Sequence, residues 1–241
     1  NRLSAERLQR LVEELGLEEF RRSCDDLQAY ASVLARDSLA DLPNGTFQFT
    51  DMMDDDGLGT ENIPIRVTLE ITDGRVRVDF SGTAAQVPGN LNCPLPVTAA
   101  AVFYVFRCFM PAQVPPCYGA MENIELSAPT GCLVNASPPA AVAAGNVETS
   151  TRIVDTVCGA LAKVIPDCIG AAAQGTMNNL AMGARGSGGW DYYETIAGGH
   201  GASAETNGKH ARHSHMTNTL NTPVEILELN YPLRIERYAL R

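Results

Sequence analysis

Two runs of alternating apolar and polar residues, joined by Asp73-Gly74, constrain the fold of this chain more than any other feature. The runs are IPIRVTLEIT at residues 63–72 and RVRVDFSG at residues 75–82. Alternation with a period of two places the apolar side chains on one face of a strand. Asp-Gly favours the tight turn that joins antiparallel strands. The sequence therefore predicts a β-hairpin here, preceded by a further strand at TFQFT, residues 46–50.

The residues before Pro43 have a different periodicity, which predicts helices. Apolar residues recur at intervals of three and four, with charged residues on the other faces: Leu8, Leu11, Val12, Leu15, Leu27, Tyr30, Ala31 and Leu34. Because Gly16 interrupts the pattern, we expect two helices. The chain accordingly divides into a helical segment, residues 1–42, and an α+β domain, residues 43–241.

Two further apolar segments have the length and spacing of buried helices. Residues 94–110 form a run too long for a strand, with prolines near its start that suit a helix entrance. Residues 153–164 repeat apolar side chains at helical spacing, with Thr149 or Ser150 as the N-cap and Pro166 as the end. The expected fold class is α+β: N-terminal helices, a hairpin and sheet region, buried helices, and an irregular region packed on strands.

The irregular region is residues 170–201, which are rich in Gly, Asn, Gln and Thr and show little helical or strand periodicity. Such segments are usually exposed loops. This one interleaves amides with Met, Leu, Trp, Tyr and Ile, and amides among apolar groups are costly unless they are paired. The alternatives to a loop are therefore a buried polar network or a ligand pocket, in which Gln174, Asn178 and Asn179 orient a neutral polar substrate.

Charge and cysteine content exclude several classes of function. The net charge of −10 and a pI near 4.8 argue against nucleic-acid binding, which needs clustered Lys and Arg. The seven cysteines contain no Cys-x-x-Cys pair, so we expect neither a zinc ribbon nor a disulfide framework, and most should be buried in a protein of the reducing cytoplasm. No leader or bilayer-spanning run is present, so we expect no membrane association. The acidic run at residues 51–57 predicts a solvated turn rather than a cation loop.

Five sequence runs together resemble the hydantoinase B and oxoprolinase family. They occur in the family's order over most of the chain: DFSGTAAQVPGNLN (79–92), AAVAAGNVETSTRIVD (140–155), QGTMNNL (174–180), YYETIAGGHGA (192–202) and HSHMTNTLNTPVEILE (213–228). The family includes B subunits of ATP-dependent N-methylhydantoinases, the C-terminal part of 5-oxoprolinases, and subunits of acetone and acetophenone carboxylases. The resemblance extends to an expected strand at residues 233–238.

The resemblance implies a function shared between subunits. An A-type ATPase subunit or domain binds ATP and phosphorylates the substrate, which agrees with the lack of a phosphate-binding loop in this sequence. The chain resembles a middle-to-late segment, so a divalent metal is expected on an N-terminal part that is missing here. We expect ATP-dependent opening of a cyclic amide, such as a hydantoin, 5-oxoproline or another lactam, by a hetero-oligomer. The alternatives are a ketone carboxylase subunit and an assembly scaffold without catalytic residues of its own.

The histidines near the C-terminus are candidates for chemistry. On a strand, His213 and His215 would share a face, and His200 and His210 could join them. A metal site would need further ligands, for which Asp191, Glu194 and Glu225 are the candidates. Because the resemblance places the metal elsewhere, we predict no metal ligand in this chain. His215 is instead predicted to orient or protonate a leaving group, since imidazole titrates near neutral pH.

The remaining candidates are short polar residues around the expected pocket. Glu194 is predicted to be a catalytic carboxylate inside it. The predicted substrate-binding residues are Asn146, Glu148, Gln174, Asn178, Asn179, His200, Thr217 and Asn218. Structural roles are the alternatives: Glu148 would favour the positive end of the following helix, and the threonines and asparagines would satisfy backbone groups in turns. Pro223 is expected to lead into an extended segment.

Overall fold

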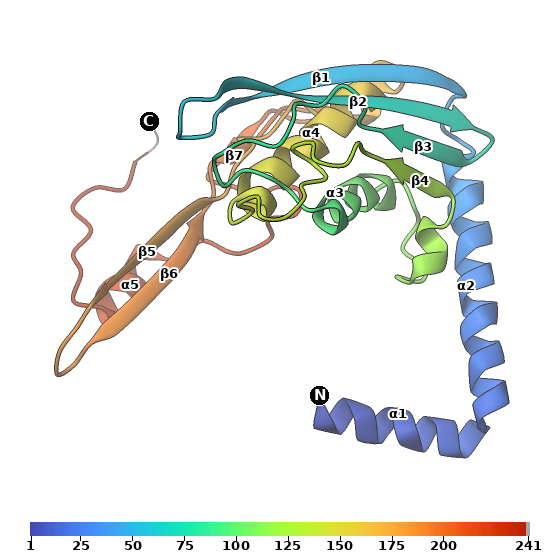
Figure 1. Ribbon diagram of the computed structural model, residues 1–241. Coiled ribbons are helices and arrows are strands. Elements are labelled where there is room, and N and C mark those ends of the chain that lie inside the picture. Colours follow the sequence, from blue (N-terminus) through green and yellow to red (C-terminus); the bar gives the residue numbers. More distant parts are fainter. Residues whose placement is uncertain (240–241) are drawn as a thin grey trace.

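A four-stranded sheet forms one layer of the molecule, in the order β1-β2-β3-β4 (Figure 1). The computed structural model describes residues 1–239. The strands are β1 (Gly45–Asp55), β2 (Glu61–Thr72), β3 (Arg75–Asp79) and β4 (Ile124–Ser127). The first three are antiparallel and β4 joins β3 in parallel. The predicted hairpin is confirmed: Thr72 pairs with Arg75, and both turn residues, Asp73 and Gly74, have positive φ (48° and 76°) as a tight hairpin turn requires.

The core lies between this sheet and two helices. Alternate residues of β2 are fully or almost fully buried: Ile63, Ile65, Val67, Leu69 and Ile71. Helices α3 (Leu95–Arg107) and α4 (Ser150–Leu161) cover the sheet on one side, and α4 also contacts β1, β2 and α3 (Figure 1). Burial of each large aliphatic side chain is worth about 1.5–3 kcal/mol, so the alternation seen in the sequence fixes which face of the sheet is covered.

The two predicted N-terminal helices are confirmed as α1 (Arg2–Leu15) and α2 (Leu17–Leu39). They meet at Gly16, whose φ of 81° lies in the region that favours glycine. Helix α2 extends away from the sheet and α1 turns at its far end (Figure 1). Only the C-terminal part of α2 enters the core, through Ala31, Ala35 and Leu39, whereas α1 has no buried residue.

The C-terminal third differs from the sequence-based predictions. The region expected to be irregular contains a β-hairpin, β5 (Asn178–Ala184) and β6 (Trp190–Ile196), followed by the short pair β7 (Gly199–His200) and β8 (Lys209–His210). The many glycines and amides concealed the alternation, because β5 is exposed along most of its length and carries little apolar pattern.

Three other local predictions were wrong. The segment after Pro223 is helix α5 (Val224–Asn230) rather than extended chain, because proline restricts its own φ and the residue before it but not the helix that follows. Residues 233–238 form no strand. Helix α4 ends at Leu161, before Pro166, in a tightened turn in which the Val164 N–H bonds to the Leu161 carbonyl.

The remaining elements are short turns of helix. The elements are a 3₁₀ turn at Tyr118–Met121, a π-type turn at Gly145–Thr149 that leads into α4, and a second 3₁₀ turn at Pro166–Cys168.

All seven cysteines are free thiols, but only Cys93 and Cys132 are buried, so the prediction that most are buried was wrong. Across residues 1–239, every helix is too short or too polar to cross a lipid bilayer.

The acidic run at residues 51–57, which was predicted to be a solvated turn, instead forms the end of β1 as far as Asp55, and the next residue, Asp56, has a buried carboxyl group. The Asp56 side chain accepts N–H bonds from Leu58 and Thr60 (both 2.9 Å) within its turn, and from Gly89 (3.1 Å) in a distant loop. Burial acts to raise the pKa of Asp56, but the three N–H donors outweigh it and lower the pKa to about 2. Asp56 therefore ties the end of the β1–β2 hairpin to the loop that leads to α3.

We expect the variant Asp56→Asn to be less stable than the wild type at pH 7. Since the pKa is lowered from 3.8 to about 2 on folding, the ionised form stabilises the fold above about pH 4, and this contribution is lost as the pH falls through 2. Urea unfolding at pH 7, 4 and 2 measures the difference, which should shrink with falling pH. Asp54→Asn, an exposed neighbour, is the matched control, and an equal loss in both variants would contradict the assignment.

Candidate active site

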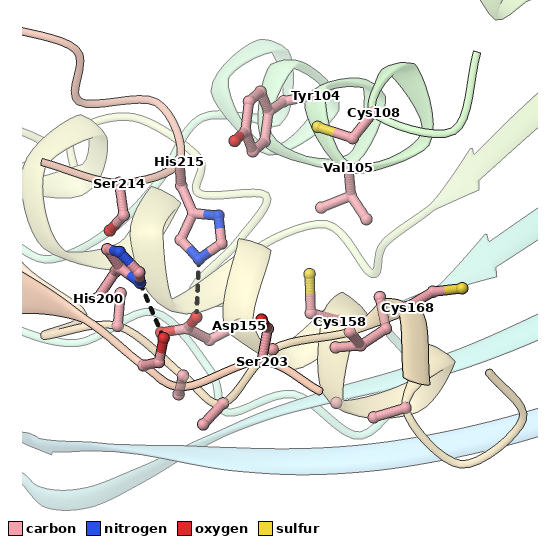
Figure 2. Close-up of a pocket in the computed structure, with 18 of the residues that line it drawn as sticks. Tyr104, Val105, Cys108, Asp155, Cys158, Cys168, His200, Ser203, Ser214 and His215 are labelled. Atoms are coloured by element: carbon pink, nitrogen blue, oxygen red, sulfur yellow. Dashed lines mark hydrogen bonds and ion pairs between the residues drawn. The ribbon is translucent and has the colours of Figure 1, made fainter. Parts of the chain in front are cut away.

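A cavity of about 730 Å³ lies between α3, α4, the middle of β1 and the loops of the C-terminal third. Its volume is typical of pockets that hold small molecules. The lining is mixed, with aromatic and aliphatic groups on one part and histidine, serine and carboxyl groups on another (Figure 2). The cavity is therefore suited to a small ligand that has both apolar and polar surface.

Helix α4 supplies the polar side of the cavity because its two faces have different surroundings. Ile153, Val154 and Val157 are fully buried in the core. Residues three and four apart share a helix face, so the opposite face brings Arg152 and Asp155 into the cavity lining, one turn apart. The apolar periodicity that predicted the helix thus also orients its cavity face.

Asp155 and His215 point toward one another across this lining (Figure 2). His215 Nε2 lies 3.5 Å from Asp155 Oδ1, and the Asp155 side chain is only 3% exposed. Neither carboxyl oxygen has a hydrogen-bond partner within the part of the chain that the structure describes. A buried carboxyl group without partners is costly, so the neighbouring imidazole is the group that can satisfy it.

The backbone around His215 is held in an uncommon conformation. His215 has φ of 53°, which costs a residue with a Cβ about 1–3 kcal/mol. Thr217 stabilises the turn, because its Oγ1 donates to the Ser214 carbonyl (2.6 Å) and its N–H donates to the same oxygen (3.1 Å). The imidazole also meets the Tyr104 ring edge-on, with 6.0 Å between ring centroids.

Arg152 is the only Lys or Arg among the described residues that line the cavity, and it is already paired. Its Nη1 lies 3.3 Å from Asp51 Oδ2, while its Nε is buried without a hydrogen-bond partner. A bound triphosphate needs several cationic or backbone N–H donors. The lining therefore does not fit the phosphates of ATP, in agreement with the lack of a phosphate-binding loop in the sequence.

Partly buried, protonated groups occupy the apolar side of the cavity. Burial raises the pKa of the Cys158 thiol to about 12, and the nearby Asp155 and Cys108 add to the effect. Burial, followed by the Cys108 thiol, also raises the pKa of Tyr104. Both side chains are therefore uncharged near neutral pH, and Cys158 is a poor nucleophile there.

The structure brings only some of the predicted site residues to the cavity. His215 and His200 line it, and Gln174 and Thr217 line a small adjoining pocket that also includes Asp155 and His215. Gln174 there donates to the Thr176 carbonyl (2.6 Å).

The other predicted site residues lie outside the cavity lining. Glu148 accepts a hydrogen bond from Thr176 Oγ1 (2.6 Å). Asn179 accepts bonds from Tyr193 and Thr195 across the exposed β5–β6 hairpin. Asn146, Asn178 and Asn218 are exposed. The substrate-binding roles of these residues stay predictions. Their positions outside the cavity lining do not favour such roles.

Glu194, the predicted catalytic carboxylate, also lies outside the cavity lining. It lies on β6, where the Tyr192 hydroxyl donates to its Oε2 and the Thr222 N–H donates to its Oε1 (2.6 Å). This arrangement joins the β5–β6 hairpin to the segment that leads into α5. A positioning role fits these contacts better than direct chemistry.

The histidines do not form the cluster that strand geometry would give. Residues 211–215 are not a strand, and His213 Nε2 contacts Thr219 Oγ1 (3.1 Å) instead of facing His215. His200 Nδ1 lies 2.8 Å from the Gly201 carbonyl oxygen, and His210 is exposed on β8. Within residues 1–239, no three His, Cys, Asp or Glu side chains lie together as potential metal ligands.

Four residues that line the cavity were not predicted from the sequence: Asp155, Arg152, Tyr104 and Cys158. For Asp155 a signal existed, because an acidic residue stands between Val154 and Val157 in a helix otherwise expected to be buried. The other contacts have no local signal: Arg152 and Asp51 are 101 residues apart in the sequence.

Comparison with known proteins identifies the family. The sequence model of Hydantoinase B/oxoprolinase matches residues 1–241. The chain belongs to the hydantoinase B/oxoprolinase family. It is 35% identical to 5-oxoprolinase of Dictyostelium discoideum over 241 residues, 97% of this chain and 18% of that protein.

Two solved structures share the fold of this hydantoinase B/oxoprolinase family member. The ATP-dependent caprolactamase from Pseudomonas jessenii has a TM-score of 0.80 and 26% identity, with 96% of this chain and 41% of that chain covered. Acetone carboxylase has a TM-score of 0.78 and 16% identity, with 93% and 33% covered, which shows a common fold. The chain thus spans less than half the length of each protein it is compared with here.

We expect Cys158 to resist alkylation in the folded protein. With its pKa raised from 9.0 to about 12, the thiolate fraction at pH 8 falls roughly 10³-fold, and the thiolate is the species that reacts with iodoacetamide. Time-resolved labelling read by peptide mass spectrometry should show Cys24, exposed on α2, reacting well before Cys158. Labelling of Cys158 at the rate of Cys24 would contradict the partly buried, neutral environment of the Cys158 thiol.

Proposed function

We propose that this chain is part of an ATP-dependent hydrolase that opens cyclic amides, such as a hydantoin, 5-oxoproline or a related lactam, together with a hydantoinase A-type ATPase. The observation that carries the proposal is the likeness to the caprolactamase over 96% of this chain at 26% identity. The 35% identity to a 5-oxoprolinase supports the same reaction class. This enzyme, the caprolactamase and the 5-oxoprolinase would each act on a C–N bond within a ring.

The cavity has the size and chemistry for such a substrate. Phe49, Tyr104 and Phe109 offer apolar surface to the methylene groups of a ring. Ser203, Ser214 and His215 offer hydrogen-bonding groups to its amide. A small neutral ring with one polar edge therefore matches the lining better than a long or highly charged ligand does.

His215 is the residue proposed to move the proton. Ring opening adds water to the amide carbon: an O–H bond of water breaks, a C–O bond forms, and the C–N bond breaks with its electron pair left on nitrogen. His215 takes the proton from the attacking water and returns it to the ring nitrogen as that nitrogen leaves.

Activation of the amide is assigned to other parts of the enzyme. Phosphorylation of the amide oxygen by ATP would make the amide carbon a better electrophile. Ring opening by the first water would then leave an acyl phosphate, which a second water would cleave to carboxylate and phosphate. Among the described residues, the cavity has no unpaired Lys or Arg to bind the phosphates of ATP. We place the ATP on the A-type partner, and the expected divalent metal on a part of the protein outside this chain. The complex would be a hetero-oligomer in the cytoplasm, where free thiols like the seven cysteines of this chain persist.

Two alternatives have their own observations. The acetone carboxylase fold supports a ketone carboxylase, although 16% identity shows only the architecture. Exposed apolar residues along α1 and α2, including Leu8, Tyr30 and Val33, at 52%, 55% and 59% exposure, support a role in subunit assembly. Assembly and catalysis are compatible, because the described residues that line the cavity include none from α1 or α2.

The test is substrate-dependent ATP turnover by the full-length protein with its A-type partner. We expect phosphate release coupled to ring opening with hydantoin, 5-oxoproline or a lactam, without bicarbonate. His215→Gln should lower the rate of ring opening by about 10²–10⁴-fold, the usual contribution of a general acid or base. His210→Gln, an exposed histidine on β8, should stay within about threefold of the wild type.

Three results would overturn parts of this proposal. A requirement for both a ketone and bicarbonate would replace the amidohydrolase by a carboxylase. Full activity of His215→Gln would remove the proton-transfer role from this cavity. A large loss in Glu194→Gln with unchanged His215→Gln would move the chemistry to β6.

A further inference from the structure

We propose that Asp155 is the positioning residue of His215: it accepts the Nε2–H and so leaves Nδ1 as the nitrogen that faces the cavity and exchanges protons. The catalytic consequence rests on the proposed function. The assignment of the hydrogen to Nε2 is independent of the proposed function, because it follows from the contacts of the two side chains. Neither the family match nor any relative described above assigns a role to Asp155.

The first observation is the isolation of the Asp155 carboxyl group. Its side chain is 3% exposed, so water cannot satisfy it from the surface. Both oxygens are buried and lack hydrogen-bond partners among the described residues. The polar atom that approaches it is His215 Nε2, at 3.5 Å from Oδ1. A buried acceptor next to an imidazole selects the tautomer with hydrogen on the nearer nitrogen.

The second observation is that the cation on the same face of α4 has another partner. Arg152 precedes Asp155 by one turn of α4, but its guanidinium group is directed to Asp51, at 3.3 Å. The two carboxyl groups of the cavity therefore have separate partners, Arg152 for Asp51 and His215 for Asp155. When a carboxyl group pairs with an imidazole and not with a cation, it fixes the orientation of an acid–base histidine.

The third observation is that the surrounding structure holds His215 against Asp155. The left-handed backbone of His215, with φ 53°, directs the ring inward, and Thr217 fastens the turn to Ser214. Tyr104 meets the ring edge-on from α3. Figure 2 shows the imidazole between Asp155 on α4 and Tyr104 on α3. With Nε2 on Asp155, Nδ1 is the nitrogen that remains for a ligand.

The chemistry follows from this placement. Nδ1 carries a lone pair while Nε2 carries hydrogen, so the ring accepts a proton from the attacking water at Nδ1. The resulting imidazolium is stabilised by the carboxyl group of Asp155 at Nε2. Nδ1 then returns the proton to the departing ring nitrogen, so the histidine ends in its starting state. Asp155 itself neither gains nor loses a proton and does not touch the substrate.

The first measurement is the tautomer of His215 in the full-length protein labelled with ¹⁵N-histidine. Two-bond ¹⁵N–¹H correlations distinguish a protonated from an unprotonated ring nitrogen. The signal of the His215 ring is identified as the one that is lost in the spectrum of His215→Gln. At a pH at which the ring is neutral, we expect hydrogen on Nε2 in the wild type. Hydrogen on Nδ1 would overturn the proposal without any variant and regardless of which reaction the enzyme catalyses.

The second measurement uses matched substitutions of the two cavity carboxyl groups. Asp155→Asn and Asp155→Ala should move His215 toward the Nδ1–H tautomer, whereas Asp51→Asn should leave the tautomer as in the wild type. In ring opening, Asp155→Asn should lower kcat by about 10²–10⁴-fold with little change in KM, because the substrate does not contact Asp155. A tautomer unchanged in both Asp155 variants would overturn the positioning role.

The two proposals fail in distinguishable ways. If the wild-type tautomer is Nε2–H and shifts in the Asp155 variants, but kcat for ring opening is unaffected, the pair exists and the proposed function of the cavity fails. If ring opening depends on His215 while the Asp155 variants retain both tautomer and kcat, the function stands and the positioning role fails.

Discussion

The packing of α4 between the sheet and α3 is the constraint on which the rest of the structure depends. Its buried face, with Ile153, Val154 and Val157 fully inaccessible, closes the core beneath β1 and β2. Because a helix has a fixed angular spacing, burial of these residues also determines where Arg152 and Asp155 point. The same helix thus stabilises the fold and orients the cavity, and a shift in its packing would move both carboxyl pairs.

A carboxyl group at the edge of this buried face does not stabilise α4. An apolar residue of similar size at position 155 would avoid the cost of desolvating Asp155. A local departure from good packing, next to a histidine in an uncommon backbone conformation, is typical of functional sites, where stability is given up for chemistry. By contrast, Asp56 is buried with three N–H donors and serves the fold.

Sequence reasoning succeeded where neighbouring residues decide the structure. The hairpin at Asp73-Gly74, the helices broken at Gly16 and the buried helix after Pro94 all carry local periodicity and turn residues, and all were predicted. It failed for β5 and β6, whose pairing depends on cross-strand contacts between segments without clear alternation.

The site was predicted less well than the fold, for the same physical reason. His215 and His200 were singled out for their chemistry and do line the cavity. Their surroundings come from tertiary packing: Asp155 lies 60 positions before His215, and the pairing of Arg152 with Asp51 spans 101. Glu194 was chosen from its aromatic and glycine neighbours, and only the fold reveals that its oxygens already bond to Tyr192 and Thr222.

The distribution of charge in the cavity supports the proposed division of the reaction between parts of the enzyme. A site that binds phosphates needs cations or free N–H groups, whereas the only Lys or Arg among the described lining residues, Arg152, is paired with Asp51. A site that moves protons needs a held imidazole, and here the His215 ring is contacted by Asp155 and Tyr104. One pocket cannot easily meet both needs, because cations beside His215 would disfavour its protonated form. The proposed division, with activation on another part of the enzyme and proton transfer in this cavity, is consistent with these electrostatics.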